Sequence, residues 1–344
     1  MKTVLQALAG LALAVALLWW VFHDTSRAGL REAVERAFWP GLALAAVVNV
    51  GHNVFRVWRW RWLLDPVAPR VPFRPMFVAV ILGYLTTWIL PGRIGEVVRP
   101  GLLSARTTVP LGPSMGSVVA DRLLDGLAIM ALFAAGSLGA RFAEGSAASI
   151  EKIRSTAFAF LAVIAVGVVV LVAIAASRTT FERWLARRAA PVRWLGHAIL
   201  GFSSGMEALR SPRRLIPIIV HSLLAWLTIA LGTWIGIRAS GADVGFDAVL
   251  VMLPLLALGV AIPTPGGVGG YHAAMQFGLT RLFGVDPTIA AGAGLLVHIA
   301  IVVPILLLGP VLLRVEGVSW SDLVAAARQI KSLGAAPVSS GATR

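Results

Sequence analysis

The chain has 344 residues, of which 58% are hydrophobic and only 13% are charged. A soluble domain has about 45–50% apolar and about 25% charged residues, so this composition excludes an ordinary soluble enzyme, a disordered chain and a nucleic-acid-binding domain. The net charge of +14 therefore indicates cytoplasmic loops that face anionic lipid headgroups rather than a nucleic-acid partner. The lack of cysteine excludes disulfides, cysteine-ligated zinc and thiol catalysis.

Long runs without charged residues predict the membrane-crossing helices, because crossing the hydrocarbon core takes about 20 apolar residues. The first run, Thr3–Phe22, ends on Trp19 and Trp20. We interpret it as a retained first helix rather than a cleaved signal peptide. The other expected segments are Ala37–Phe55, Pro75–Gly92, Met115–Ala140, Thr156–Ser177, Leu215–Ile237, Ala248–Thr280 and Pro287–Leu313.

Two of these runs are interrupted by proline and glycine. A straight helix cannot pass through such breaks without losing hydrogen bonds, and in lipid the freed backbone groups must be buried in protein or line a cavity. The breaks therefore predict two re-entrant hairpins, with two kinked helices or helix-linking turns as the alternative. The residues at the breaks are Pro91, Gly92 and Gly95 in the first run, and Pro263, Pro265, Gly266, Gly267 and Gly269 in the second.

The distribution of arginine predicts the orientation. The segment Arg178–Arg214 is rich in arginine and is placed in the cytoplasm. The basic segment Arg56–Arg74 falls on the same side if the first hairpin enters and leaves from the cytoplasm. Both termini are then cytoplasmic, and the two hairpins enter from opposite sides, as in an inverted-topology repeat.

The predicted fold is therefore an all-α polytopic protein of the inner membrane. It has six full spans and two opposed re-entrant hairpins, so about eight membrane segments. We expect a single domain over residues 1–315, with repeat halves at about 37–140 and 215–313, followed by a partly disordered cytoplasmic tail at 316–344.

Three motifs in order carry a resemblance to a known family: Leu90–Pro100 (LPGRIGEVVRP), Asp121–Asp125 (DRLLD) and Pro263–Gly269 (PTPGGVG). The chain resembles the flippase-like family, which is the transmembrane domain of lysylphosphatidylglycerol synthases and its stand-alone relatives. The resemblance implies an integral membrane protein that moves, or helps to move, a polar lipid between leaflets. Only a short tail follows Leu313, so the aminoacyl-transferase activity of the full synthases is not expected. Family members often have a glutamate where this chain has Tyr271 and His272.

Candidate headgroup ligands follow the first break. Arg93, Glu96 and Arg99 have the spacing i, i+3, i+6 and share one helix face. Free backbone N–H groups at a helix N-terminus favour an anion, and arginine suits phosphate geometry. We predict that Arg93 and Arg99 bind a lipid phosphate and that Glu96 positions one of them. The alternative is an interfacial basic turn with a structural Arg–Glu pair.

A second group of charges, Asp121, Arg122 and Asp125, opens the next expected span. It is predicted to pair with Arg93 or Arg99 across the hairpin or to gate proton movement. The alternative is a charge pair stabilised by the helix dipole.

Other polar and aromatic residues of the expected spans receive separate predictions. Tyr271 and His272 follow the second break and are further candidate headgroup contacts. His52, His221 and His298 are expected to make an interhelical hydrogen bond or to relay protons. The alternating stretch Trp58–Trp62 is interpreted as an interfacial anchor. Amphipathic surface helices are expected within Glu182–Arg214 and Val318–Arg328.

Three functions remain open at this point. The first is a transporter that moves a polar, phosphate-containing lipid by alternating access. The second is a membrane-embedded headgroup transferase using Glu96 with Asp121 or His272, and the third is an accessory subunit of a lipid-biosynthesis complex. No catalytic motif, cofactor or metal site is predicted, so we do not expect an enzyme. The expected partners are the lipid substrate, anionic headgroups at the cytoplasmic face, and a second copy or a biosynthetic protein.

Overall fold

The computed structural model describes residues 2–23, 25–90, 94–142 and 207–326, with isolated helical positions between 151 and 169. Within these residues every regular element is helical, which confirms the predicted all-α fold. Two of the described helices, α10 (Pro212–Ala239) and α13 (Pro287–Val315), are each long and apolar enough to cross a membrane. A third crossing is added if Ala9–Phe22 and Arg27–Glu35, which meet at 86°, form one bent span.

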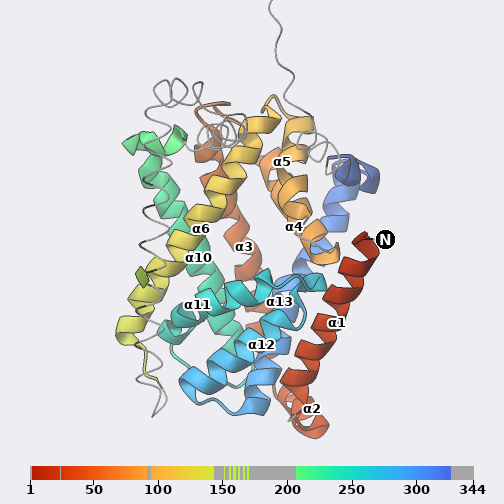
Figure 1. The fold of residues 1–344 in the computed structure, drawn as a ribbon, viewed down its shortest axis with the longest axis vertical. Coiled ribbons are helices and arrows are strands. Elements are labelled where there is room, and N and C mark those ends of the chain that lie inside the picture. The colour runs from red at the N-terminus through yellow and green to blue at the C-terminus, as the bar shows by residue number, and fades with distance from the viewer. Residues whose placement is uncertain are drawn as a thin grey trace, which may run out of the picture.

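Four of the described helices run almost the full height of the molecule in Figure 1. The segments expected from the sequence, of which Met115–Ala140 carries charges near its start, predicted where each of them begins to within a few residues. α13, for example, begins at Pro287 because the side chain of Asp286 accepts hydrogen bonds from the N–H groups of Thr288 and Ile289. The four helices are α3 (Trp39–Leu64), α6 (Leu111–Gly139), α10 and α13.

The structure corrects the predicted end of α3. This helix does not stop at Phe55 but continues to Leu64. Arg56 and Arg59, which were expected in a cytoplasmic loop, therefore lie within a helix and are buried. The predicted helix ended too early because Arg56 was taken as the start of a loop exposed to water.

Both predicted breaks separate two helices that pack against each other. The first helix pair is α4 (Phe73–Ile89) with α5 (Gly95–Arg106), and the second is α11 (Phe246–Ala261) with α12 (Gly270–Phe277). In Figure 1 the first helix pair lies in the upper half of the molecule and the second in the lower half. A short 3₁₀ turn, η2 (Pro265–Gly267), connects α11 to α12.

A glycine on each arm lets the two backbones of a helix pair approach closely. A Cβ atom on Gly95 would overlap the carbonyl oxygen of Gly83, and a Cβ on Gly270 would overlap the carbonyl oxygen of Gly259. Small residues allow this approach in membrane helices generally. The two helix pairs thus use the same packing device, although their sequences share little else.

The remaining described helices complete the two ends of the molecule. α1 packs against α12, and α2 begins at a cap in which Ser26 accepts a hydrogen bond from the N–H of Gly29. A short helix at 320–326 lies against α5, where Ala326 is in contact distance of Gly101. These elements are α1 (Lys2–Phe22), α2 (Arg27–Glu35), the 3₁₀ turn η1 (Glu207–Arg210) and the π-helical turn η3 (Gly278–Leu282).

The hydrophobic interior consists of two large clusters, each built around one helix pair. The first includes Leu82 of α4 and Leu103 of α5, and the second includes Val249 of α11 and Met275 of α12. Three of the full-height helices, α6, α10 and α13, contribute to both clusters, whereas α3 contributes to the first: on α6, Leu124 belongs to the first and Ile129 to the second. The two clusters therefore meet about halfway along the full-height helices, and the charged residues described below lie at that boundary.

Some predictions fall outside the described residues. These are the residues of the first break other than Gly95, namely Pro91, Gly92 and Arg93. The expected span Thr156–Ser177 and the expected surface helix within Glu182–Arg214 are also largely outside them, as is the tail from residue 327 onward.

Candidate functional site

Two aspartates lie near the middle of α6, on one face of the helix. Asp125 is halfway between Leu111 and Gly139, so it is about 21 Å along the axis from either end at 1.5 Å per residue. Asp121 is one turn away, and both side chains are buried. A carboxylate at this depth is costly unless it is paired, which makes its partners the first question.

Asp121 is surrounded by guanidinium groups from three different helices. Its Oδ1 atom lies 2.6 Å from Nη2 of Arg59 on α3. Its Oδ2 atom accepts a hydrogen bond from Nη1 of Arg99 on α5 at 3.0 Å and one from Nη2 of Arg122, its neighbour on α6, at 3.2 Å. The prediction that Asp121 pairs with Arg99 across the first helix pair is therefore confirmed as a contact.

Asp125 makes a similar set of contacts. Its Oδ2 atom accepts a hydrogen bond from Nη1 of Arg56 at 3.0 Å and lies 3.3 Å from Nη1 of Arg122. Its Oδ1 atom lies 2.9 Å from Nη1 of Arg59 and accepts a hydrogen bond from Nε1 of Trp226 on α10 at 2.8 Å. Arg59 thus bridges the two aspartates, and four helices meet at one network.

Aromatic rings form the walls of this network. The guanidinium carbon of Arg99 lies 4.2 Å from the ring centroid of Trp60, whose Nε1 atom donates to Oγ of Ser117 at 2.8 Å. The guanidinium of Arg56 lies between the rings of Tyr84 and Trp226, at 5.9 and 5.5 Å. These rings exclude water and stabilise the cations by contact with their π faces.

We call the charged residues of this network the charge cluster. Among the described residues it comprises four arginines and three acidic residues, which leaves an excess of positive charge. Its members are Arg56, Arg59, Arg99, Arg122, Glu96, Asp121 and Asp125.

Some donors of the charge cluster have no acceptor within the part of the chain that the structure describes. These are the Nε atoms of Arg56, Arg59, Arg99 and Arg122 and the Nη2 atom of Arg99, all enclosed. An unpaired buried donor costs free energy until an acceptor reaches it. Excess positive charge together with unpaired N–H groups is the arrangement that a phosphate or carboxylate ligand would complete.

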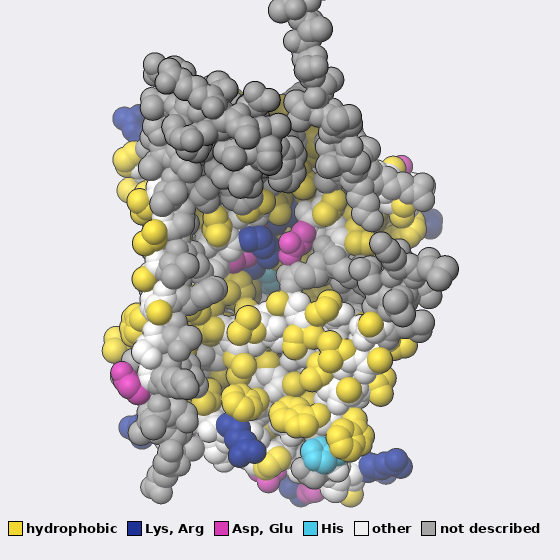
Figure 2. Space-filling model, in the orientation of Figure 1, with side chains coloured by type: hydrophobic (Ala, Val, Ile, Leu, Met, Phe, Trp, Pro, Cys, Tyr) yellow, Lys and Arg dark blue, Asp and Glu magenta, His cyan; other side chains and the backbone are white. Residues whose placement is uncertain are grey.

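The charge cluster reaches the surface at one edge. The side chains of Arg122 and Glu96 are about one-third exposed, and Nη1 of Arg122 lies 4.0 Å from Oε1 of Glu96. Glu96 is in the first turn of α5, where a carboxylate is favoured by the helix dipole. Figure 2 shows basic and acidic side chains together in a hollow near mid-height of a largely apolar face. A ligand can therefore approach the cluster from this side.

Of the predicted headgroup ligands, the structure brings five together: Glu96, Arg99, Asp121, Arg122 and Asp125. Arg93 lies outside the described residues. Glu96 was expected to position Arg93 or Arg99; among the described residues it lies 4.0 Å from Arg122, and its expected pairing with Arg93 falls outside them.

The sequence analysis missed Arg56 and Arg59. The stretch Trp58–Trp62 was interpreted as an interfacial anchor, and this is wrong for Arg59 and Trp60, which are fully buried. One signal was available: Arg56 and Arg59 have the spacing i, i+3 and would share a helix face, as Asp121 and Asp125 do.

Tyr271 and His272 lie in a different place, at the start of α12. His272 stacks on His298 of α13 with ring centroids 4.7 Å apart, and Tyr271 meets the same ring edge-on at 5.2 Å. His298 also makes a hydrogen bond with the backbone of Gly266 in η2, so the predicted bond to another helical segment is found beside this ring contact. His52 and His221 differ from the prediction, because each bonds a carbonyl of its own helix.

The glycines of the second break hold the chain in a shape that other residues rarely adopt. Gly266, Gly267 and Gly269 have φ angles of 63°, 66° and 88°. A side chain on Gly269 would also collide with Ala14 and Leu17 of α1. The break between Pro263 and Gly269 is therefore a specific turn that packs against α1 rather than a simple kink.

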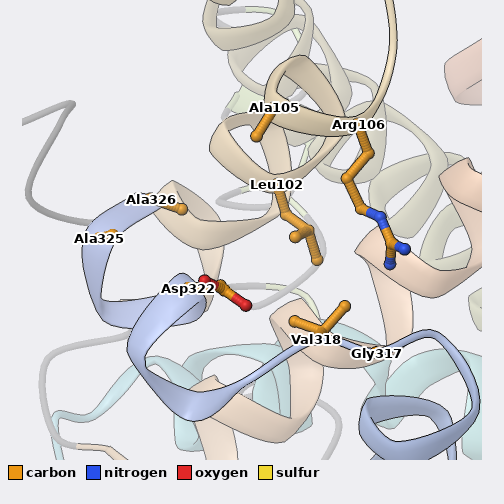
Figure 3. A pocket seen from close by; sticks show the side chains of 8 residues that line it. All are labelled: Leu102, Ala105, Arg106, Gly317, Val318, Asp322, Ala325 and Ala326. Carbon is orange, nitrogen blue, oxygen red and sulfur yellow. The ribbon is translucent and has the colours of Figure 1, made fainter.

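A separate pocket lies between α5 and the helix at 320–326. It has a volume of about 490 Å³ and is apolar, with Arg106 and Asp322 at its edges (Figure 3). Arg106 donates from Nη2 to the carbonyl oxygen of Glu316 at 2.7 Å, which ties the end of α5 to the end of α13. The pocket does not include any residue of the charge cluster.

Comparison with known proteins assigns the chain to a family. Residues 7–309 match the family described as the lysylphosphatidylglycerol synthase TM region. A curated relative is "Glycosyltransferase AglD" of Haloferax volcanii, which is 24% identical over 286 residues. That match covers 75% of this chain but 46% of the relative, so the chain spans less than half the length of that protein. The protein therefore belongs to the lysylphosphatidylglycerol synthase transmembrane-region family and is a multi-pass membrane protein.

Proposed function

We propose that the protein moves a polar, phosphate-containing lipid between the leaflets of the membrane by alternating access. The single observation that carries this proposal is the charge cluster, with its excess positive charge and unpaired N–H groups near the midpoint of α6. A transporter needs its substrate site near the midplane, and charged groups at that depth are retained for function.

The contacts within the cluster indicate which part of the lipid it would recognise. Asp121 and Asp125 each contact three arginines of the described chain, so their oxygens are already engaged. The groups left without a hydrogen-bond or ion-pair partner in the described chain are N–H donors on Arg56, Arg59, Arg99 and Arg122. This favours a headgroup recognised through its phosphate oxygens rather than through an ammonium group.

The arrangement of the helices supports an alternating-access mechanism. α3, α4, α5 and α6 form one series, and α10, α11, α12 and α13 form a second. In Figure 1 the full-height helices α10 and α13 run in the opposite vertical sense to α3 and α6. Each series has a full-height helix on either side of a helix pair. This arrangement supports the proposal of an inverted repeat with two opposed re-entrant hairpins, in which one half would rock against the other around a central site.

We further propose that the protein lies in the inner membrane with both termini in the cytoplasm. The basic character of the chain supports this orientation. Anionic headgroups would then contact the arginine-rich side, and a second copy or a lipid-biosynthesis protein remains a proposed partner.

The test is lipid movement in liposomes that contain the purified protein. A phospholipid with a fluorescent label is placed in one leaflet, and its appearance in the other leaflet is followed by a quencher that cannot cross the membrane. Wild type is expected to move an anionic phospholipid, and Arg99→Gln is expected to lose most of this activity. Arg238→Gln is the matched control, because Arg238 forms an exposed pair with Asp243 away from the cluster.

A second candidate function is a lipid-headgroup transferase or its accessory subunit. The observation that favours it is the similarity to the Haloferax volcanii relative, which is named as a glycosyltransferase. Mass spectrometry of the lipids recovered from the same liposomes separates the two, after incubation with nucleotide-sugar donors. A modified headgroup would support the transferase, whereas movement of chemically unchanged lipid would support the transporter.

A further inference from the structure

Four rings meet where the two helix pairs approach each other. His272 of α12 stacks on His298 of α13, with 4.7 Å between centroids and 21° between planes. Tyr271 lies edge-on to His298 at 5.2 Å, and Trp88, at the end of α4, lies 5.9 Å from the same ring. Both imidazoles are more than nine-tenths buried. We call these four residues the imidazole cluster.

The imidazole cluster joins the tip of the second helix pair to the end of α4 in the first. Trp88 is within 3.5 Å of where side chains on Gly266 and Gly267 would begin, so it lies directly against the second break. The N–H of Gly269, in the same break, donates to Nδ1 of His272 at 3.3 Å. Because Nδ1 accepts this bond, the proton of neutral His272 is on Nε2.

No ion pair with a carboxylate, lysine or arginine is found for either imidazole in the described chain. The titratable groups that face them are the hydroxyl of Tyr271 and the other imidazole, while Trp88 and Phe22 contribute uncharged rings. The charged residues of the surrounding helices are distant along their own axes. Arg281 in η3 is about 2.5 turns from His272, Asp286 at the N-cap of α13 is about three turns from His298, and Arg74 and Arg314 are about four turns away.

Protonation would therefore disrupt this cluster. A proton bound at Nδ1 of His272 removes the acceptor of the Gly269 N–H and sets two N–H groups against each other. The resulting cation would lie against a second imidazole without a counter-ion, in surroundings of low dielectric, where an unpaired charge is expensive. Separation of the rings and entry of water would relieve both effects.

We propose that the His272–His298 stack is a proton-binding site that latches the two helix pairs together, and that lipid movement is coupled to protons at this site. The neutral stack holds the second break against Trp88. Uptake of one proton from water opens this contact, and release of that proton to water restores it. The coupling to lipid rests on the proposed transport function, whereas the latch itself does not.

The latch can be measured without any transport. The chain has no cysteine, so single cysteines at Ile89 and Leu258, whose side chains are 48% and 67% exposed, accept spin labels specifically. Electron paramagnetic resonance then gives the distance between α4 and α11 in lipid nanodiscs at pH values of about 8 and about 5, the range in which histidine titrates. We expect a longer and broader distance distribution at the acid pH.

The variants His272→Gln and His298→Gln test whether the stack causes this change. Glutamine can accept the Gly269 hydrogen bond but does not bind a proton in this range. Both variants are expected to keep the short distance at both pH values, while His221→Gln, on α10, should behave as wild type. An unchanged wild-type distance, or an equal change in the two stack variants, would overturn the latch.

Proton coupling is tested in the liposome assay with an imposed pH gradient of either direction. In wild type, one direction of the gradient is expected to accelerate lipid movement, and this acceleration should disappear in His298→Gln. Lipid movement that ignores the gradient would overturn the coupling while leaving the proposed transport intact. If no lipid moves under any condition, the transport proposal fails, and the spin-label distances still decide whether the latch exists.

Discussion

Arg59 is the residue on which the charge cluster most depends, because its guanidinium contacts both Asp121 and Asp125 and its side chain has no exposed surface. Removing one partner of a buried ion pair leaves the other charges uncompensated. The cluster therefore stabilises the meeting point of α3 and α6 only while it is complete. The same contacts make it a preformed site, since the aspartates fix the directions of the arginines that would meet a ligand.

We predict that Arg59→Met lowers the free energy of unfolding by about 3–5 kcal/mol, the usual cost of breaking a buried pair. The measurement is the unfolding transition of the purified protein in detergent. Arg31→Met is the control, because Arg31 and Glu35 form an exposed pair on α2 whose loss should cost about 0–1 kcal/mol. Equal transitions for the two variants would show that Arg59 is hydrated rather than enclosed.

The burial of Arg56 and Arg59 could not be predicted from the local sequence pattern. Arg56 and Arg59 interrupt an apolar run, and an arginine in such a run normally marks the membrane surface. Their positive charges are compensated by Asp125 and Asp121, more than 60 positions further along the chain. Asp125 is in turn held by a hydrogen bond from Trp226 on α10. In contrast, the pairing of Arg99 with Asp121 could be predicted, because their helices α5 and α6 follow each other directly along the chain.

The helix pairs are defined by proline and glycine, and these residues act in two ways. Proline ends α4 and α11 by removing backbone donors, and glycine then allows the returning arm to pack closely. Gly83 and Gly95 in the first pair correspond to Gly259 and Gly270 in the second. The two helix pairs therefore share the same close approach of glycine backbones.

We predict that Gly95→Ala destabilises the protein by about 1–3 kcal/mol, the range for overpacked sites, because the new methyl group would overlap the carbonyl of Gly83. Gly270→Ala should have a similar effect in the second helix pair. Gly112→Ala is the matched control in α6, where nothing lies within 4 Å of the new atom. The variants are compared by thermal unfolding in detergent, and an unchanged Gly95→Ala would contradict the close approach of α4 and α5.

Helix positions were predictable where the apolar run and the helix coincide, as in α1, α10 and α13. The end of α3 was not, because burial of its last turns depends on tertiary contacts rather than on composition. The positions of the breaks were predicted correctly. The sequence did not reveal that the imidazole cluster forms beside the second break, because its members come from three separate helices, α4, α12 and α13.

At the scale of the molecule, the charge cluster lies between the two hydrophobic clusters. Each helix pair has its own apolar surroundings, and the charges lie at the boundary between them. If the halves move relative to each other, this boundary is where a path through the membrane would open. The proposed opposite orientation of the two halves makes a direct prediction about the two surfaces of the protein.

Single cysteines in this cysteine-free chain test that orientation. Arg70→Cys and Ser319→Cys should react with a membrane-impermeant reagent from one side of the membrane. Asp243→Cys and Asp286→Cys should react from the other side, because these exposed loops lie at the opposite end of the full-height helices. We expect the first pair to be cytoplasmic. Labelling of Arg70→Cys and Asp243→Cys from the same side would contradict the inverted arrangement.

The most direct test of the central claim is binding of a lipid phosphate to the charge cluster. Native mass spectrometry of the purified protein can compare a phosphatidic acid with the diacylglycerol of identical chains. Wild type is expected to retain the phosphate lipid at least tenfold more strongly, a difference of about 1.4 kcal/mol. Arg99→Gln should lose this preference and Arg238→Gln should keep it. Equal retention of the two lipids by wild type, or an unchanged preference in Arg99→Gln, would contradict the account.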